Sequence, residues 1–280
     1  MDASSEPGLR PVAGTPGLLD AVAANVARVI HAPAETLRLC VLCLASEGHL
    51  IIEDFPGVGK TMLAKALARS IDCEFSRLQF TPDLLPSDVT GVNVFNQRLN
   101  EFEFRAGPVF TNLLLVDEVN RASPKTQSGL LECMQERHVT VDATSHELAR
   151  PFMVFATQNP VEYEGTYPLP EAQVDRFMVR LELGYPSAAE EAGMLEGHEG
   201  GDRVLDLKPV ADRAEVLECQ DAARRVHASK ALRDYIVALL HHTRQCPDVR
   251  ASVVVPGVEL LAGEHGFAQL RLRHRDAEGF

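Results

Sequence analysis

Apolar residues recur along the chain with two different periods, and each change of period marks an expected helix or strand. Apolar positions at three-to-four spacing predict a helix over Leu18–Ile30 and a second helix from about Glu35 to Ser46. The period then changes at Leu50–Ile52, a short apolar run that predicts a strand ending at Glu53. A turn-rich loop follows, and after it we expect a helix over Thr61–Arg69.

The middle of the chain alternates apolar runs with helical patterns. Expected strands cover Phe75–Phe80, Leu113–Val116, Phe152–Ala156 and Met178–Leu183, and expected helices cover Asp83–Val89 and Pro124–Glu136. The last three strands are expected to be buried, and Leu113–Val116 is apolar throughout, which is typical of a strand covered on both faces in a parallel sheet. Strands alternating with helices predict an α/β fold with a three-layer parallel sheet.

Two further segments predict β-hairpins, and the region after Pro186 differs from the rest. Alternation over Val92–Phe104 predicts a hairpin that turns near Arg98–Asn100, and Val139–Leu148 predicts a second hairpin. A helical pattern covers Ala214–Cys246. We therefore expect four parts: a disordered arm over 1–17, an α/β core over 18–186, a helical lid over 187–250 and an atypical tail over 251–280.

Composition narrows the classes of function. The 280 residues carry 40 acidic and 27 basic side chains, for a formal net charge of −13, and no basic stripe is visible. Nucleic-acid binding is therefore not expected, because phosphate neutralisation dominates the affinity of such proteins. The N-terminus lacks the features of a signal peptide, and the longest apolar stretch, Leu37–Ala45, is too short to span a bilayer. We expect a cytoplasmic protein without a membrane span.

The only closely spaced cysteine pair, Cys40 and Cys43, lies in an apolar helical pattern. A zinc site would need a second pair of ligands at suitable spacing, and none is present in the sequence. Core packing is therefore the expected role of both cysteines. His241 and His242 have no ligand partner at suitable spacing either, and we expect them at the surface.

The strongest chemical signal is a glycine-containing loop between the first strand and the following helix, the layout of a nucleotide site. Its glycines let backbone N–H groups wrap round a phosphate chain, and the helix adds its positive N-terminal end. Lys60 would neutralise the β and γ phosphates of ATP, and the Thr61 hydroxyl would ligate Mg²⁺. The expected nucleotide-binding residues are Asp54, Phe55, Pro56, Gly57, Val58, Gly59, Lys60, Thr61 and Met62. The general phosphate-loop pattern has Gly where this chain has Asp54, so a glycine loop with a chance lysine remains an alternative.

Polar residues that follow later strands could complete the site. Asp117 and Glu118 end an apolar strand, so Asp117 would hold Mg²⁺ through water and Glu118 would polarise the attacking water. Asn159 follows another strand and is suited to orient that water, although a turn residue before proline is the alternative. Arg176, expected inside a short helix that begins near Glu171, could stabilise phosphate charge in a neighbouring subunit, or could be a surface ion-pair partner.

Together these segments resemble the MoxR family of AAA+ ATPases over roughly Ala24 to Arg250. The strings that carry the resemblance are Glu53–Thr61, Gln79–Gly91, Asp117–Ala122, Thr157–Pro160 and Glu164–Gln173. These strings extend far beyond a phosphate loop alone, so the resemblance is specific. The family also commonly carries Asp at the first loop position, which fits Asp54.

The resemblance implies a fold, an assembly and a class of function. It implies an AAA+ core with an insertion at about Val92–Arg105, a hairpin before the sensor strand at about His138–Arg150, a helical lid and a ring that is usually hexameric. Arg176 then corresponds to the arginine finger and Asn159 to the first sensor. Members of the family are regarded as chaperone-like motors that mature client proteins or insert their metal cofactors, often with a partner that carries a von Willebrand factor A domain.

One segment departs from the family. After Pro247–Arg250 the family usually continues with Gly-Ala-Ser-Pro-Arg, whose arginine contacts the γ phosphate, whereas residues 251–257 here contain no Pro-Arg pair. A frame change near Arg250 or a genuine divergence would each explain the difference. We expect impaired coupling of hydrolysis to motion and weak ring assembly.

Three alternative functions remain open. The first is a nucleotide-binding subunit with impaired hydrolysis, owing to the missing lid arginine. The second is a nucleic-acid motor, which predicts basic, aromatic-bearing hairpins. The hairpin regions hold Arg98, Arg105 and Arg137 but also Glu101, Glu103 and Glu136, so their charges nearly cancel. The third, a P-loop kinase, has no use for Asn159 and Arg176 in their family setting.

Overall fold

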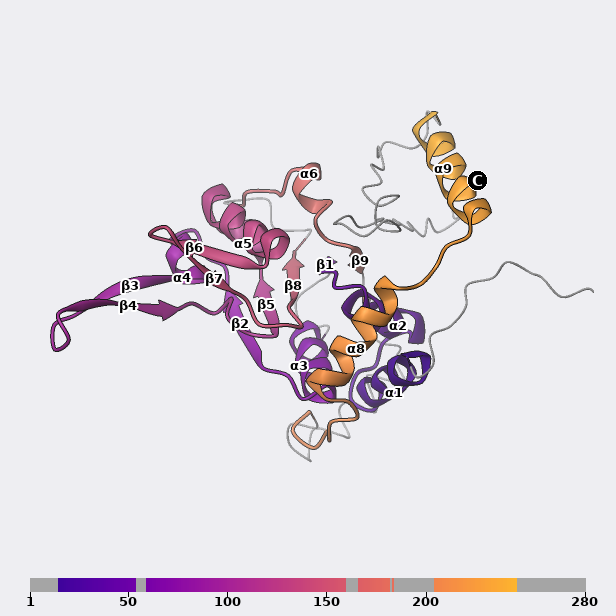
Figure 1. Ribbon diagram of the computed structural model, residues 1–280, viewed down its shortest axis with the longest axis horizontal. Coiled ribbons are helices and arrows are strands. Elements are labelled where there is room, and N and C mark those ends of the chain that lie inside the picture. Colours follow the sequence, from indigo (N-terminus) through magenta and orange to yellow (C-terminus); the bar gives the residue numbers. More distant parts are fainter. Residues whose placement is uncertain (1–14, 54–58, 160–165, 182, 184–203, 246–280) are drawn as a thin grey trace, which may run out of the picture.

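The structure is a computed structural model that describes residues 15–53, 59–159, 166–181, 183 and 204–245 (Figure 1). Five of the expected nucleotide-binding residues, at positions 54–58, lie outside the described residues. The tail over 251–280, on which the predicted departure from the family depends, also lies outside them, as does most of the predicted junction between core and lid.

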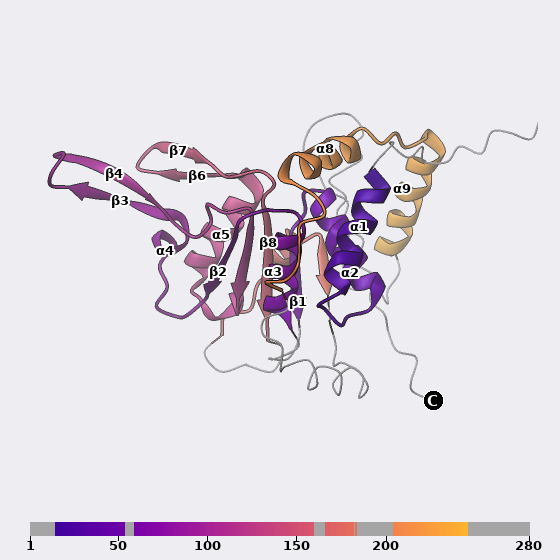
Figure 2. The same cartoon turned by 90° about the horizontal axis from the view of Figure 1, so that it is seen from below.

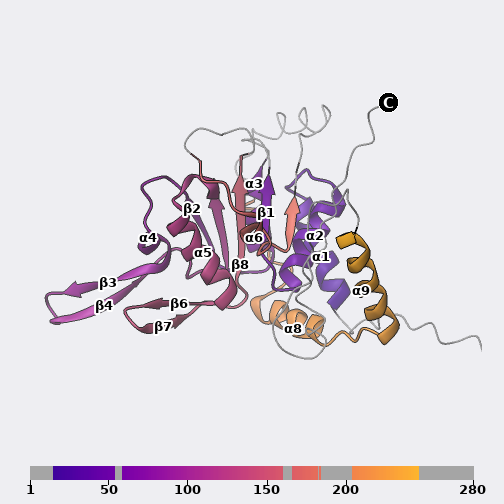
Figure 3. The ribbon, with the colours of Figure 1, turned by 90° about the horizontal axis from the view of Figure 1, so that it is seen from above.

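A five-stranded parallel sheet forms the centre of the fold. Its strands are β1 (Leu50–Glu53), β2 (Phe75–Gln79), β5 (Leu113–Asp117), β8 (Met153–Gln158) and β9 (Val179–Leu181), in the spatial order β2-β5-β8-β1-β9. All five run in the same direction (Figure 3). The expected strands are confirmed with one correction. The strand predicted over Met178–Leu183 is shorter and lies at an edge of the sheet, where it is only partly buried because a single neighbour pairs with it.

Helices cover both faces of this sheet, which confirms the three-layer arrangement. Successive strand residues point to opposite faces, so Leu113 and Leu115 join one apolar cluster whereas Leu114 and Val116 join another. The first cluster includes residues of α1 (Thr15–Ala27), α2 (Ala34–Ala45) and α3 (Lys60–Ser70). The second includes residues of α4 (Pro86–Thr90) and α5 (Pro124–Glu136). In Figure 1 the strands lie between α5 above and α3 below.

The first helix begins earlier in the chain than the sequence predicts. Helix α1 begins at Thr15, so residues 15–17 belong to a helix and not to the disordered arm expected over 1–17. Proline is tolerated in the first turn of a helix, where its missing N–H would have no intrahelical partner in any case. Pro16 therefore marks the start of this helix.

Two helices beyond residue 204 confirm the helical pattern expected there, namely α8 (Arg213–Arg224) and α9 (Lys230–Gln245). The segment that leads into α8 packs against the core, because Val204, Leu207 and Val216 are buried in the same cluster as α1–α3. The side-chain amide of Gln220 also donates to the Leu44 carbonyl of α2 at 2.8 Å. Residues 204–224 therefore rest on the α/β core, and a lid that begins at residue 187 stays a prediction.

The two expected hairpins are confirmed and lie side by side, projecting from the sheet (Figure 2). They are formed by β3 (Gly91–Asn96) with β4 (Glu101–Ala106), and by β6 (His138–Val141) with β7 (Thr144–Glu147). The Asn93 amide donates to Asp142 at 2.8 Å, and the Phe104 ring stacks on His146 with centroids 3.9 Å apart. Asn93 and Phe104 are paired in the first hairpin, so these contacts join the two hairpins at that pair.

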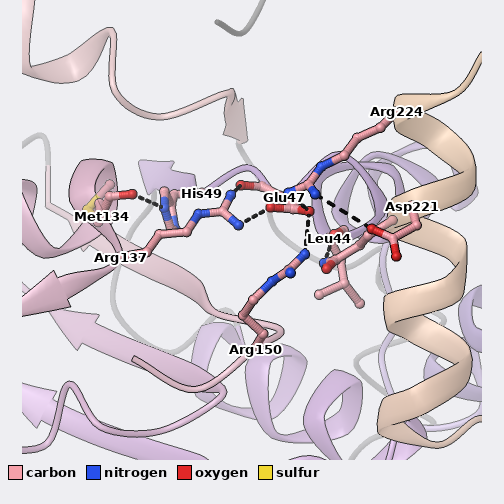
Figure 4. A network of polar contacts seen from close by, with 9 residues as sticks. Leu44, Glu47, His49, Met134, Arg137, Arg150, Asp221 and Arg224 are labelled. Atoms are coloured by element: carbon pink, nitrogen blue, oxygen red, sulfur yellow. Dashed lines mark hydrogen bonds and ion pairs between the residues drawn. The ribbon is translucent and has the colours of Figure 1, made fainter. Parts of the chain in front are cut away.

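A buried carboxylate ties the second hairpin to α2 and α8 at the amino-terminal end of the sheet (Figure 4). Glu47 follows α2, its side chain is only 5% exposed, and it pairs with Arg137, Arg150 and Arg224. Arg137 precedes β6, Arg150 follows β7, and Arg224 ends α8. Burial, followed by the repulsion of Arg224 and Arg150, lowers the pKa of Arg137 to about 10. One carboxylate therefore neutralises part of the charge of three converging arginines.

His49 lies next to this network and is held as a neutral ring. Its Nδ1 accepts the backbone N–H of Val154 at 3.0 Å, and its Nε2 lies 3.1 Å from the Met134 carbonyl, to which it can donate. Only the tautomer with its proton on Nε2 satisfies both contacts. A second proton on Nδ1 would face the Val154 N–H. Burial of the ring lowers the pKa of His49 from 6.5 to about 4.

We expect acid to destabilise the protein through His49. Between pH 6.5 and about 4 the unfolded chain binds the His49 proton and the folded chain does not, so this contribution is complete above pH 6.5 and decreases as the pH falls. At pH 4.5 the loss is about 2–3 kcal/mol, at 1.36 kcal/mol per pKa unit. Urea unfolding between pH 7.5 and pH 4.5, compared with His49→Gln, measures it. An identical pH dependence in both proteins would contradict the prediction.

The remaining structural expectations concern scattered residues. Cys40 and Cys43 are both buried in the core, as expected, and burial raises the pKa of Cys40 to about 12. His241 and His242 are exposed, which confirms their predicted surface position. Across the described ranges, no helix is both long enough and apolar enough to cross a bilayer.

Candidate nucleotide-binding site

The first part of the candidate site is the start of α3. Gly59 adopts φ +89°, a left-handed conformation that favours glycine, and α3 begins immediately after it at Lys60. Among the described residues, no side chain caps this end of the helix, so its first N–H groups and its dipole favour an anion there. Lys60, Thr61 and Met62 are all half-buried. The helix that the sequence predicts after the phosphate loop is therefore confirmed, and the loop itself stays a prediction.

The second part is the carboxyl end of β5, which lies next to β8 and not next to β1. The register pairs Val116 with Ala156, so Asp117 lies beside Thr157 of β8, while Thr157 also pairs with Ile52 of β1. The predicted phosphate loop follows β1, whereas the two carboxylates lie at the end of β5. These two strands are not neighbours, because β8 lies between them. Because the strands are parallel, their carboxyl ends still meet at one edge of the sheet.

Thr157 connects the two acidic residues, a role that sequence reasoning did not identify. Its hydroxyl donates to Asp117 Oδ1 at 3.2 Å and accepts the backbone N–H of Glu118 at 2.9 Å. Thr157 is 3% exposed, so this hydroxyl has few other orientations available. Thr157 does occur in a string that resembles the family, but only the order of the strands shows which groups it contacts.

Two arginines contact the acidic residues and were also missed. Arg77 of β2 donates from Nε to Asp117 Oδ2 at 2.6 Å, and Arg121 donates from Nη1 to Glu118 Oε2 at 2.8 Å. Arg77 is 40 positions from Asp117 in the sequence, so only strand pairing could reveal its contact. Arg121 is three positions from Glu118, and that spacing was a local signal.

Asn159 and Arg176 occupy the ends of described segments. Asn159 directly follows β8 and is half-buried, so it lies at the same edge of the sheet as Asp117. Helix α6 (Glu171–Val174) ends before Arg176, which lies in the turn after it and not inside the helix as expected. The Arg176 N–H donates to the Gln173 carbonyl at 3.2 Å, the bond of a closing turn. Arg176 is half-buried.

The donor set fits ATP with magnesium. A carboxylate and a hydroxyl are hard oxygen ligands of the kind that Mg²⁺ prefers, and Asp117 and Thr61 supply one of each. The N-terminus of α3, which no side chain of the described residues caps, has Lys60 in its first turn and provides N–H donors and positive charge for a phosphate chain. When bound, the metal ion and the nucleotide would supply an electrophilic phosphorus with its charge partly neutralised.

The chain is similar to several known proteins. Residues 49–179 match the family described as ATPase family associated with various cellular activities (AAA). The chain is 47% identical over 260 residues to the protein named uncharacterized protein YeaC of Bacillus subtilis, which covers 92% of this chain and 81% of YeaC. It is 42% identical over 221 residues to chaperone MoxR1 of Mycobacterium tuberculosis, which covers 79% of this chain and 58% of MoxR1. The chain therefore spans less than two thirds of MoxR1.

Further similarity comes from a more distant relative and from a solved structure. Protein MoxR of Paracoccus denitrificans is 29% identical over 236 residues, which covers 77% of this chain and 66% of that protein. A crystal structure of a candidate ATPase from Cytophaga hutchinsonii has a TM-score of 0.74 at 41% identity, over 81% of this chain and 69% of that chain.

Proposed function

Because the chain belongs to the MoxR family of AAA+ ATPases, we propose that it binds ATP with Mg²⁺ and hydrolyses the ATP to drive remodelling of client proteins. One observation carries the proposal. At a single edge of the sheet, the start of α3 with Lys60, which no described side chain caps, lies on the same side as the Asp117–Thr157–Glu118 network. An anion site and a metal-binding carboxylate at one edge are what phosphoryl transfer requires.

Each residue has a proposed part in the reaction. Residues 54–62 cradle the phosphates, Lys60 neutralises their charge, and Thr61 with Asp117 holds Mg²⁺. Glu118 accepts a proton from the attacking water, and Asn159 orients that water. Arg176 acts on the nucleotide of a neighbouring subunit, where a positioned arginine contributes a factor of about 10³–10⁵ in rate.

The proposed assembly is a ring, with six subunits as the expected number from the family resemblance, in which Arg176 of one subunit completes the site of the next. The proposed work is the maturation of client proteins, or metal-cofactor insertion into them, with a partner that carries a von Willebrand factor A domain. A cytoplasmic location stays a prediction. Among the curated relatives, MoxR1 is named a chaperone, which supports the client-directed role.

Lys60→Ala tests the nucleotide site. We expect the affinity for ATP with Mg²⁺ to fall about tenfold to hundredfold, because a charge-assisted hydrogen bond contributes about 1.5–3 kcal/mol. Lys65→Ala is the matched control, since Lys65 lies in the same helix and alanine is the best helix former. Binding is measured by titration with a fluorescent ATP analogue. Unchanged affinity in the Lys60 variant would contradict the proposal.

A further inference from the structure

Arg121 lies in a tight turn that brings it into contact with Glu118. Glu118 adopts φ +55°, and the 3₁₀ helix η1 (Val119–Arg121) follows it, closed by the Arg121 N–H donating to the Glu118 carbonyl at 2.9 Å. Glu118 itself precedes this helix as its N-cap, and the backbone hydrogen bond brings the two residues together across the turn. The guanidinium of Arg121 lies 2.8 Å from Glu118 Oε2.

The backbone of this turn is held from outside. The side-chain amide of Gln127, 1% exposed in α5, lies within hydrogen-bonding distance of the carbonyls of Val119, Ala122 and Tyr167, at 3.1, 3.2 and 2.9 Å. The Tyr167 N–H donates to the Asn120 carbonyl at 2.6 Å. Buried contacts therefore fix the backbone that carries Arg121, and the arginine approaches Glu118 from a defined direction.

The other side of Glu118 is fixed by β8. The Glu118 N–H donates to the Thr157 hydroxyl, which also donates to Asp117. The Glu118 backbone is thus clamped between β8 and the turn, and its side-chain torsions are the remaining freedom. A long carboxylate side chain has several rotamers, and a partner on one oxygen selects among them.

We propose that Arg121 is a positioning residue for ATP hydrolysis, which holds one oxygen of Glu118 so that the other faces the attacking water. The proposal rests on the function proposed above. Arg121 acts through Glu118 and touches neither water nor phosphate in this role. A carboxylate held by one oxygen keeps the second available as a proton acceptor.

The solvent exposure of the Arg121–Glu118 ion pair allows a positioning role to be distinguished from a structural role. The side chains of Arg121 and Glu118 are 42% and 31% exposed, and ion pairs this accessible contribute only about 0–1 kcal/mol to stability. A structural role therefore predicts little change in any property when Arg121 is replaced. A positioning role predicts a large change in kcat alone, because small misplacements of catalytic groups cost up to about a hundredfold.

The test compares Arg121→Gln and Arg121→Lys with wild type in steady-state ATP hydrolysis by the full chain. We expect kcat of Arg121→Gln to fall about tenfold or more, with KM and ATP affinity unchanged within about twofold. Arg121→Lys should recover part of the rate, since lysine keeps the charge but not the planar fork. Arg38→Gln is the control, because Arg38 of α2 forms another exposed ion pair, with Asp20 of α1 at 3.5 Å.

A double variant sharpens the comparison. Adding Arg121→Gln to Glu118→Gln should leave the residual rate of Glu118→Gln unchanged, because residues that act as a unit are not additive. An unchanged kcat in Arg121→Gln would overturn the proposal. A raised kcat would also overturn it and would show instead that the pair restrains Glu118. Turnover that is lost in Lys60→Ala but normal in Arg121→Gln would leave the proposed function standing, whereas no turnover in wild type would overturn both.

Discussion

Replacing Glu118 by glutamine is expected to lower ATP turnover by about 10²–10⁴, the range for removal of a general base, while ATP still binds. Glutamine keeps the size of the side chain and its acceptor oxygen, but it cannot take a proton from the attacking water. The backbone contacts of Glu118 with Thr157 do not involve the side chain and should survive. The phosphate contacts proposed for Lys60 and Thr61 lie on another element, so binding should be retained.

Phosphate release and nucleotide binding measured on the same preparations check this prediction. Glu132→Gln on the exposed face of α5 makes the same chemical change away from the site and should behave as wild type. Equal turnover in the Glu118 variant and in wild type would favour the alternative of a nucleotide-binding subunit with impaired hydrolysis. If turnover is lost as expected, pull-down of this variant with ATP offers a way to trap the ring with a bound client.

Replacing Glu47 by alanine is expected to lower the free energy of unfolding by about 3–5 kcal/mol, because removal of one partner leaves buried charge without compensation. Glu47 faces three arginines, and Arg137 already has a lowered pKa from burial and from repulsion by the other two. Without the carboxylate this repulsion has nothing to oppose it. Arg150 and Arg224 are about half-exposed and can partly turn to water, which favours the lower end of the range.

Urea unfolding measures this loss directly. Asp221→Ala is the matched control, since Asp221 also pairs with Arg224, at 3.6 Å, but is 58% exposed and should cost at most about 1 kcal/mol. Glu47→Gln keeps the shape and removes the charge, so a loss close to that of alanine would assign the effect to charge. A Glu47→Ala protein as stable as the Asp221 variant would contradict the expected role of this network.

Much of the fold followed from local patterns. The apolar runs Leu113–Val116 of β5 and Met153–Ala156 of β8 predicted strands covered on both faces, because such runs are typical of buried strands in a parallel sheet. Helix α5 has the bounds predicted from its periodicity and its first-turn proline. The errors occurred where the pattern is weak, at both ends of α1, at the start of α4, at the end of α6 and in the short edge strand β9. Such boundaries depend on caps and neighbours more than on period.

The sequence likewise identified some residues of the candidate site and missed others. Lys60, Asp117, Glu118 and Asn159 could be selected because each follows a strand or begins a helix, and such positions gather at one edge of a parallel sheet. Their partners could not be selected by that argument. Arg77 and Thr157 reach Asp117 only because β2 and β8 flank β5, and strand order is not encoded in any single segment.

The sequence by itself determined the type of fold, the helix that follows the predicted phosphate loop and the membership of a family, because periodicity and contiguous motifs are local properties of the chain. Tertiary structure alone decided which polar groups from distant parts of the chain contact one another. Glu47 pairs with arginines 90, 103 and 177 positions away. The Thr157 hydroxyl contacts the Asp117 carboxylate and the Glu118 backbone N–H, 40 and 39 positions away. Such contacts arise from packing, which buries distant polar groups together and so forces them to satisfy one another.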